Sequence, residues 1–121
     1  MYTASEPFAA FMIDSIFIRT SVCQREKSVI GIVAKVKVKA GSEAAFETAA
    51  RELIACTLKE PGVLDYGLWR TERADTYAFV ERYKDDAAIE AHVKSEHFRR
   101  INRQFRELLE GAPEVTKLLP L

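Results

Sequence analysis

The order in which strand and helix patterns follow one another limits the fold of this 121-residue chain more than any other feature. Residues Val29 to Val38 are apolar and then alternate valine with lysine, as a strand does when one end is buried. Apolar residues recur at helical spacing from Phe46 to Leu58. Two further strands are predicted at Val63 to Thr71 and at Thr76 to Lys84, and a short final strand at Glu114 to Leu119.

A second helical segment lies before the final strand and completes a β-α-β-β-α-β order. This order predicts an α+β, ferredoxin-like fold, in which helices cover one face of an antiparallel four-stranded sheet. The two middle strands are expected to pair as a hairpin across the turn from Glu72 to Asp75. The other face of the sheet would expose Val, Leu, Trp and Tyr side chains to water. We therefore expect two copies to pack face to face as a homodimer.

Short polar residues mark the expected helix starts. Ser42 follows a turn and is the expected cap of the first helix, which a Pro-Gly pair would end. Asp85 and Asp86 can cap the second helical segment, because a carboxylate accepts the free N–H groups of a first turn. Ser95 is a candidate cap for a new helix, so it predicts a break within this segment.

The only two histidines of the chain, His92 and His97, lie on either side of the predicted break. On one straight helix they would lie about 140° apart, because each residue turns the helix by about 100°. They would therefore not form a metal-binding pair four residues apart, and we expect no metal. A break at Ser95 would re-aim His97, which gives a bent helical segment with two imidazoles near the bend.

Composition excludes several classes of partner. Basic and acidic residues both number 18, so nothing favours nucleic acid or an anionic membrane as a partner. No stretch reaches the roughly 18 apolar residues of a membrane span. The two cysteines, Cys23 and Cys56, match no zinc or redox motif and are expected to be reduced thiols, although a disulfide is possible. These features predict a cytoplasmic protein.

The length predicts one domain, preceded by an extension. Residues 29–121 hold the whole pattern of strands and helices, and residues 1–28 lie outside it. The extension contains Phe8, Phe11, Met12 and Phe17, which are too apolar for a free tail. We expect it to pack onto the body or onto a partner subunit, as an extra strand, a covering helix or an arm.

Polar groups on the middle strands indicate candidate ligand contacts. Tyr66 and Trp69 need hydrogen-bond partners if they are buried, although both could serve packing alone. Gly67 between them could leave room for a ligand or mark a bulge. Glu81 shares a strand face with aromatic residues and would be costly to bury alone, so Arg70, a lysine or another subunit is expected to contact it.

Three motifs, in this order and at these spacings, resemble one known family. They are KEPGVLDYGL at Lys59 to Leu68, FVERYKD at Phe79 to Asp85 and AHVKSEHF at Ala91 to Phe98. The sequence from residue 29 to residue 121 resembles the antibiotic biosynthesis monooxygenase (ABM) domain family, which includes small quinol monooxygenases. The resemblance implies a dimeric α+β barrel with a cavity between the sheet and the helices of each protomer.

The resemblance also implies an activity, namely oxidation of a quinol or polycyclic phenol by O2 without flavin, haem or metal. A deprotonated phenol is electron-rich enough to reduce O2, so the protein must supply a base, an apolar cage and hydrogen-bond donors. His92 is the best candidate base, because its unperturbed pKa of about 6.5 suits neutral pH. The candidate substrate-binding residues are Tyr66, Trp69 and His97, followed by Tyr83 and Arg70.

Haem-degrading proteins share this fold and use an asparagine, a tryptophan and a haem-ligating histidine. By motif alignment these positions fall at Ala34, His92 and Asn102, and none of the three residue types matches. We therefore argue against haem degradation.

Two other functions stay open. Isomerases of small phosphorylated hydroxyketones resemble this sequence in carrying a histidine pair at the same bend, and Lys35 or Arg70 could bind the phosphate. The chain could also be a ligand-binding dimer without catalysis. In that case His92 would be a packed, half-buried histidine, and His97 could cap a backbone carbonyl.

Overall fold

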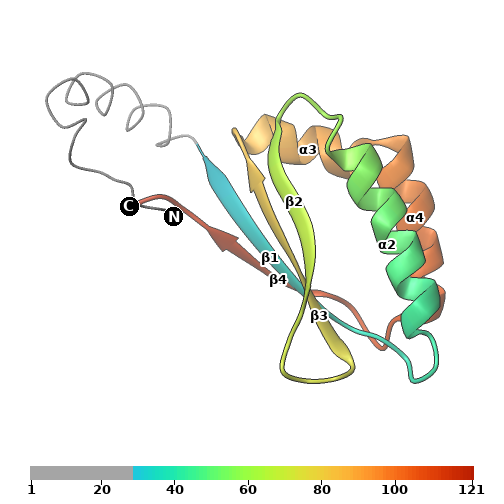
Figure 1. Cartoon of the computed structure of the whole chain (residues 1–121). Coiled ribbons are helices and arrows are strands. Elements are labelled where there is room, and N and C mark those ends of the chain that lie inside the picture. The colour runs from blue at the N-terminus through green and yellow to red at the C-terminus, as the bar shows by residue number, and fades with distance from the viewer. Residues whose placement is uncertain (1–28) are drawn as a thin grey trace, which may run out of the picture. The chain divides into compact units, whose positions relative to one another are not determined.

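The computed structural model describes residues 29–121, which fold as seven elements (Figure 1). Their bounds are β1 Ile30–Lys37, α2 Glu43–Thr57, β2 Val63–Arg70, β3 Thr76–Tyr83, α3 Asp86–Lys94, α4 Glu96–Leu108 and β4 Glu114–Leu118. This series confirms the predicted β-α-β-β-α-β order, with the second helical segment split into α3 and α4. The predicted packing of residues 1–28 lies outside the described residues.

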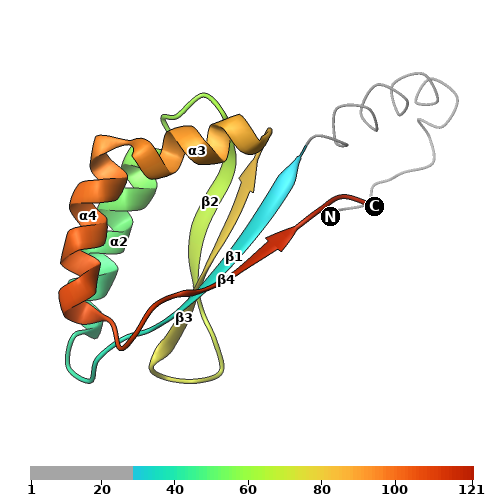
Figure 2. The ribbon, with the colours of Figure 1, turned by 180° about the vertical axis from the view of Figure 1, so that it is seen from behind.

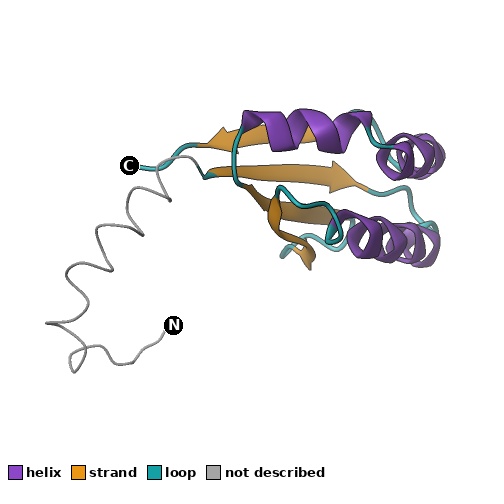
Figure 3. Cartoon of the chain, turned by 90° about the horizontal axis from the view of Figure 1, so that it is seen from above, coloured by secondary structure: helices purple, strands orange, loops and turns teal. Residues whose placement is uncertain are grey.

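The four strands form one antiparallel sheet in the order β2-β3-β1-β4. The predicted hairpin of β2 and β3 is confirmed, with Arg70 opposite Tyr77 near its turn. Helices α2 and α4 run beside each other on the same side of the sheet, and α3 leads into α4 at the bend (Figures 1 and 2). Figure 3 shows from above how the helices lie relative to the strands.

The core lies between the sheet and the helices and is centred on Phe46 of α2, which is fully buried. Its ring centroid lies 5.0 Å from that of Tyr77, 6.2 Å from that of Phe79 and 5.0 Å from that of Phe105 on α4. These contacts place aromatic rings of β3, α2 and α4 in one cluster, which fixes the helices over the sheet. The apolar residues at helical spacing along α2 therefore belong to the core, except Leu58, which is 52% exposed.

The predicted helix starts are correct in position, but only two of them use a side-chain cap. Asp85 accepts a hydrogen bond from the backbone N–H of Ala88 at 2.9 Å. Ser42 stands at the N-cap of α2 without a side-chain hydrogen bond there. The Glu43 carboxylate instead accepts from the backbone N–H of Gly41 at 3.0 Å. Ser95 caps α4, where its side-chain oxygen accepts from the backbone N–H of Phe98 at 3.2 Å.

The irregular point of β2 lies near Leu64 and not at Gly67. The register shifts between Val63 and Asp65, which leaves Leu64 half exposed. Gly67 pairs regularly with Val80. Because neighbouring Tyr66 points into the core, Gly67 lies on the opposite face and leaves no room there for a ligand among the helices.

The face of the sheet away from the helices carries exposed apolar side chains. Trp69 is 64% exposed, Val80 36% and Leu118 49%. Their register partners Ala78, Gly67 and Gly31 are small. Within residues 29–121 no helix covers this face. Its apolar side chains would face water in a monomer, so a partner on this face is still expected.

Gly62 should be intolerant of a side chain, because a Cβ at this position would overlap Cβ of Ala88 at the start of α3. We expect Gly62→Ala to lower the free energy of unfolding by about 1–3 kcal/mol, the cost of overpacking. Gly67→Ala is the matched control, because the nearest atom to its Cβ is Nε1 of Trp69 at 3.8 Å. Urea denaturation of both variants checks this, and equal stabilities would contradict it.

Candidate active site

A cavity of about 190 Å³ lies between the sheet and helices α3 and α4. Most of its wall is apolar and includes Ile32, Ala34, Phe98, Phe105 and Val115. The polar side chains that reach it are Tyr66, Glu81, Tyr83, His92 and Asn102. An apolar chamber with a few converging polar groups is the usual form of a small-molecule site.

His92 is deeply buried at this cavity, with 2% of its surface exposed. Its ring centroid lies 4.8 Å from that of Phe98, 5.1 Å from that of Tyr66 and 5.8 Å from that of Tyr83. Helix α3 supplies His92 from one side and the sheet supplies the two tyrosines from the other. The imidazole is therefore held in one orientation by aromatic rings.

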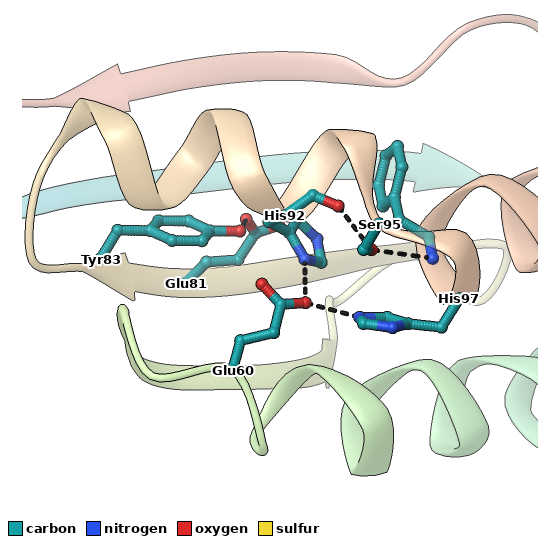
Figure 4. A network of polar contacts seen from close by, with 7 residues as sticks. Glu60, Glu81, Tyr83, His92, Ser95 and His97 are labelled. Carbon is teal, nitrogen blue, oxygen red and sulfur yellow. Dashed lines mark hydrogen bonds and ion pairs between the residues drawn. The ribbon is translucent and has the colours of Figure 1, made fainter.

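Glu60 joins the two histidines (Figure 4). It lies in the loop between α2 and β2, and its Oε2 atom is 2.9 Å from Nδ1 of His92 and 2.5 Å from Nε2 of His97. A carboxylate can only accept hydrogen bonds, so each of these ring nitrogens carries the proton and donates it. Neutral His92 then has an unprotonated Nε2, and this buried atom has no hydrogen-bond partner among residues 29–121.

Ser95 fixes the bend that brings the two histidines together. Its backbone leaves the helical region, with φ −67° and ψ 153°. Its hydroxyl donates to the carbonyl of His92 at 2.7 Å and accepts from the N–H of Phe98 at 3.2 Å. The predicted break is confirmed. The His92 carbonyl is capped by Ser95, whereas His97 turns its Nε2 to Glu60.

Burial controls the charge of His92. Removal from water lowers the pKa of His92, and the nearby Glu60 carboxylate opposes this only in part. The imidazole is therefore neutral at pH 7, which is the form that can accept a proton.

Burial acts in the opposite direction on the acids of the cavity. It raises the pKa of Glu81 from 4.5 to about 7, although Tyr83 donates a hydrogen bond to its Oε1 at 2.6 Å. Burial and the neighbouring Glu81 and Glu60 carboxylates also raise the pKa of Tyr66 and of Tyr83, so both hydroxyls stay protonated. The cavity thus holds a neutral base, a carboxyl group that titrates near pH 7 and two phenol groups.

The predicted site residues fall into two groups. Tyr66, Tyr83 and His92 line the cavity, and His97 adjoins it through Glu60. Trp69 and Arg70 do not line it. The indole lies on the exposed face of the sheet, and the guanidinium contacts the carboxylate of Glu47 at 3.3 Å.

Two acidic residues of the site differ from the sequence-based expectation. Within residues 29–121, the hydroxyl of Tyr83 contacts Glu81 in place of the expected Arg70 or lysine. The alternative contact from another subunit stays a prediction. Glu60 was not expected in the site at all. The sequence feature that could have indicated Glu60 is the first family-like motif, in which this glutamate directly precedes the Pro-Gly pair that ends the helical region.

The donor atoms of this site could also bind a metal ion. Glu60, His92 and His97 offer one oxygen and two nitrogens within 4.8 Å of one another, a donor set that Zn²⁺ accepts. The hydrogen bonds of both imidazoles to the Glu60 carboxylate already account for this grouping.

The fold and cavity define a ferredoxin-like α+β protein with an apolar small-molecule site. Residues 29–104 match the family model "Antibiotic biosynthesis monooxygenase", and the chain belongs to this family. The resemblance seen in the three motifs is therefore confirmed.

Individual relatives agree with this assignment. The chain is 28% identical to the Bacillus subtilis (strain 168) protein named "Putative monooxygenase YcnE" over 90 residues, which are 74% of this chain and 95% of that protein. A crystal structure of a conserved protein from Methanosarcina mazei Go1 is similar, with a TM-score of 0.78 and 29% identity over 82% of this chain and 99% of that one. The structure of Rv0793 from Mycobacterium tuberculosis has a TM-score of 0.74 and 26% identity, over 78% of this chain and 96% of that one.

Together, the family description and the names "Putative monooxygenase YcnE" and "Putative monooxygenase Rv0793" support a monooxygenase-type function for this chain. Within residues 29–121, no helix is long and apolar enough to cross a lipid bilayer. The cytoplasmic location stays a prediction.

Glu81→Gln should change how stability depends on pH. The pKa of Glu81 is raised in the folded state, so between pH 4.5 and about 7 the folded protein keeps a proton on Glu81 that the unfolded chain has lost. The free energy of unfolding of the wild type therefore falls as the pH rises through this interval. The neutral amide removes this loss. We expect the variant to match the wild type at pH 4 and to exceed its free energy of unfolding by about 1–3 kcal/mol at pH 8.

Urea denaturation at both pH values measures the effect. Glu47→Gln is the matched control, since Glu47 also accepts a tyrosine hydroxyl at 2.6 Å but has a lowered pKa, caused first by Tyr77 and then by Arg70 and Arg51. It should show no gain at pH 8. A Glu81→Gln variant without a gain would mean that the carboxylate is well solvated in the folded state.

Proposed function

We propose that the protein is a cofactor-independent monooxygenase that oxidises a quinol or a polycyclic phenol with O2. The observation that supports this most directly is the unprotonated Nε2 of His92, which is buried at an apolar cavity without a hydrogen-bond partner among residues 29–121. A substrate hydroxyl is the group that such an atom can bind and deprotonate. Glu60 would stabilise the imidazolium that forms, because it accepts from Nδ1 at 2.9 Å.

The cavity suits the next step as well. Deprotonation leaves a phenolate, which can pass electrons to O2 in a chamber whose apolar walls exclude water. Tyr66 lines the same cavity and its hydroxyl stays protonated, so it can donate a hydrogen bond to a developing oxyanion. Tyr83 already donates its hydroxyl proton to Glu81. The protein would therefore supply a base, a donor and an apolar environment.

The electron count explains why no separate reductant is needed. Conversion of a hydroquinone to a hydroxyquinone removes four electrons from the substrate. One molecule of O2 accepts four electrons when one oxygen atom enters the product and the other leaves as water. A quinol and O2 thus balance without flavin, haem or metal.

The isomerase alternative has less support in this cavity. A phosphorylated substrate needs cationic partners. Among residues 29–121, neither lysine nor arginine lines the cavity. Lys35 lines a separate surface pocket with Lys37 and Arg73, and Arg70 contacts Glu47. The remaining alternative, ligand binding without turnover, is tested together with the proposal.

The main test is oxygen uptake by metal-free and flavin-free protein with a panel of hydroquinones and naphthalenediols. We expect uptake above autoxidation, and a decrease of about a hundredfold or more in His92→Ala, the scale of a lost general base. His92→Gln is the second variant, because it fills more of the buried space and can still donate to Glu60. Circular dichroism and thermal melting confirm that each variant is folded.

The outcomes separate the functions. Uptake that both His92 variants retain would remove His92 from the mechanism. Tight binding of an aromatic ligand without uptake would favour the binding protein. Binding that needs inorganic phosphate would favour the isomerase.

We also propose that the functional unit is a homodimer that buries the outer face of the sheet. Exposed Trp69, Val80 and Leu118 lie on this face, and an apolar patch on a sheet is typical of a subunit interface. Light scattering at micromolar concentration should give twice the mass of the chain. Trp69→Lys should weaken dimer formation by about tenfold or more, because losing a large aromatic contact at an interface costs about 1–2 kcal/mol or more.

Leu58→Lys is the control, since Leu58 is 52% exposed at the end of α2 and not on the sheet. It should leave the dimer intact. A monomeric wild type would refute the buried-sheet argument.

A further inference from the structure

Glu81 is a buried carboxyl group that the proposed reaction has not used. Only 8% of its surface is exposed, and it lines the same cavity as His92. No salt bridge to it is found within residues 29–121. A buried carboxyl group without a cationic partner is costly for the fold, so its position needs an explanation.

The neighbours of Glu81 lie on β1, β2, β3 and α3. Across the sheet, Tyr66 of β2 and Ile32 of β1 lie opposite it. Tyr83 on its own strand donates to Oε1 at 2.6 Å, and α3 brings His92 into the same cavity. The titratable groups of the lining are therefore two tyrosines, one neutral histidine and Glu81 itself.

These groups give the cavity two acceptors for a ligand. One is the unprotonated Nε2 of His92. The other is the carboxylate of Glu81, which accepts a single side-chain hydrogen bond, at Oε1, and has its second oxygen left for a ligand. An apolar ligand with two hydroxyl donors would satisfy both, whereas a ligand with one hydroxyl would leave one acceptor without a partner.

We propose that Glu81 is a second catalytic residue of this cavity, which binds a second hydroxyl group of the substrate and takes its proton while His92 takes the first. This inference rests on the proposed function, because it concerns the same cavity and a quinol substrate. It explains why a carboxyl group is kept in an apolar chamber without a salt bridge.

The protons balance in this scheme. The two hydroxyl protons of a hydroquinone pass to His92 and Glu81, and the resulting dianion adds O2 at a ring carbon to form a peroxide. The O–O bond then breaks as the electrons of that carbon's C–H bond form a new C=O bond. The distal oxygen receives the two stored protons and leaves as water. The ring proton moves to the new oxygen of the hydroxyquinone.

Anaerobic calorimetry tests the recognition step without turnover. The probes are 1,4-dihydroxynaphthalene and 1-naphthol, which differ by one hydroxyl group. At pH 8 we expect the wild type to bind the diol about tenfold or more tightly than the naphthol, the scale of one hydrogen bond to a charged group. Glu81→Gln should bring this ratio close to one. A Glu81→Gln protein that keeps the preference overturns the inference.

Glu47→Gln is the matched control, because Glu47 makes the same short contact with a tyrosine, Tyr77, but lies outside the cavity. It should keep the diol preference. If Glu81→Gln does not fold, the pH dependence of the wild type tests the inference. The preference of the wild type for the diol over the naphthol should rise between pH 6 and pH 8, because Glu81 ionises in this interval. His92 contributes equally to the binding of both ligands, because both carry the hydroxyl group that it accepts, so its effect cancels in the ratio. A ratio that stays constant with pH overturns the inference.

Oxygen uptake separates this inference from the proposed function. Uptake that falls about a hundredfold in Glu81→Gln supports both. Uptake that Glu81→Gln leaves unchanged overturns the role of Glu81 and keeps the oxygenase. A diol preference that depends on Glu81, without any uptake, supports recognition by Glu81 and overturns the oxygenase. Failure of the wild type to bind either ligand overturns both.

Discussion

The contact of the Glu60 carboxylate with two imidazoles is the interaction on which the candidate site depends. It links the loop after α2 with α3 and α4, and it places the proton of His92 on Nδ1. Without an acceptor there, the ring could carry its proton on Nε2 and would offer the cavity a donor in place of a base. The aromatic rings around His92 hold the ring plane, but only Glu60 selects the tautomer.

Burial then gives the polar groups their separate properties. The same apolar surroundings that lower the pKa of His92 raise the pKa of Glu81 to about 7. The first change keeps a base neutral, and the second keeps an acid partly protonated, so both can exchange protons near neutral pH. A more polar cavity would bring both groups back towards their ordinary charge states and would admit water that competes for the substrate anion.

Local patterns predicted the order of the elements, the cap at Asp85 and the break at Ser95, because each depends on residues close in sequence. The role of Glu60 was not predictable in this way, since its partners are 32 and 37 residues away. Alternation along a strand puts Tyr66 and Arg70 on one face of β2. It could not show that Arg70, at the end of the strand, meets Glu47 on α2 and not the cavity.

Two glutamate–tyrosine pairs show why residue type alone does not assign a role. Tyr77 donates to Glu47 at 2.6 Å, and Tyr83 donates to Glu81 at the same distance. Beside Glu47 two arginines add to the effect of the tyrosine, and the pKa of Glu47 falls. At Glu81, only the hydrogen bond from Tyr83 opposes the effect of burial, so the pKa of Glu81 rises. The surroundings of the pair therefore decide which glutamate is a fixed charge and which can move a proton.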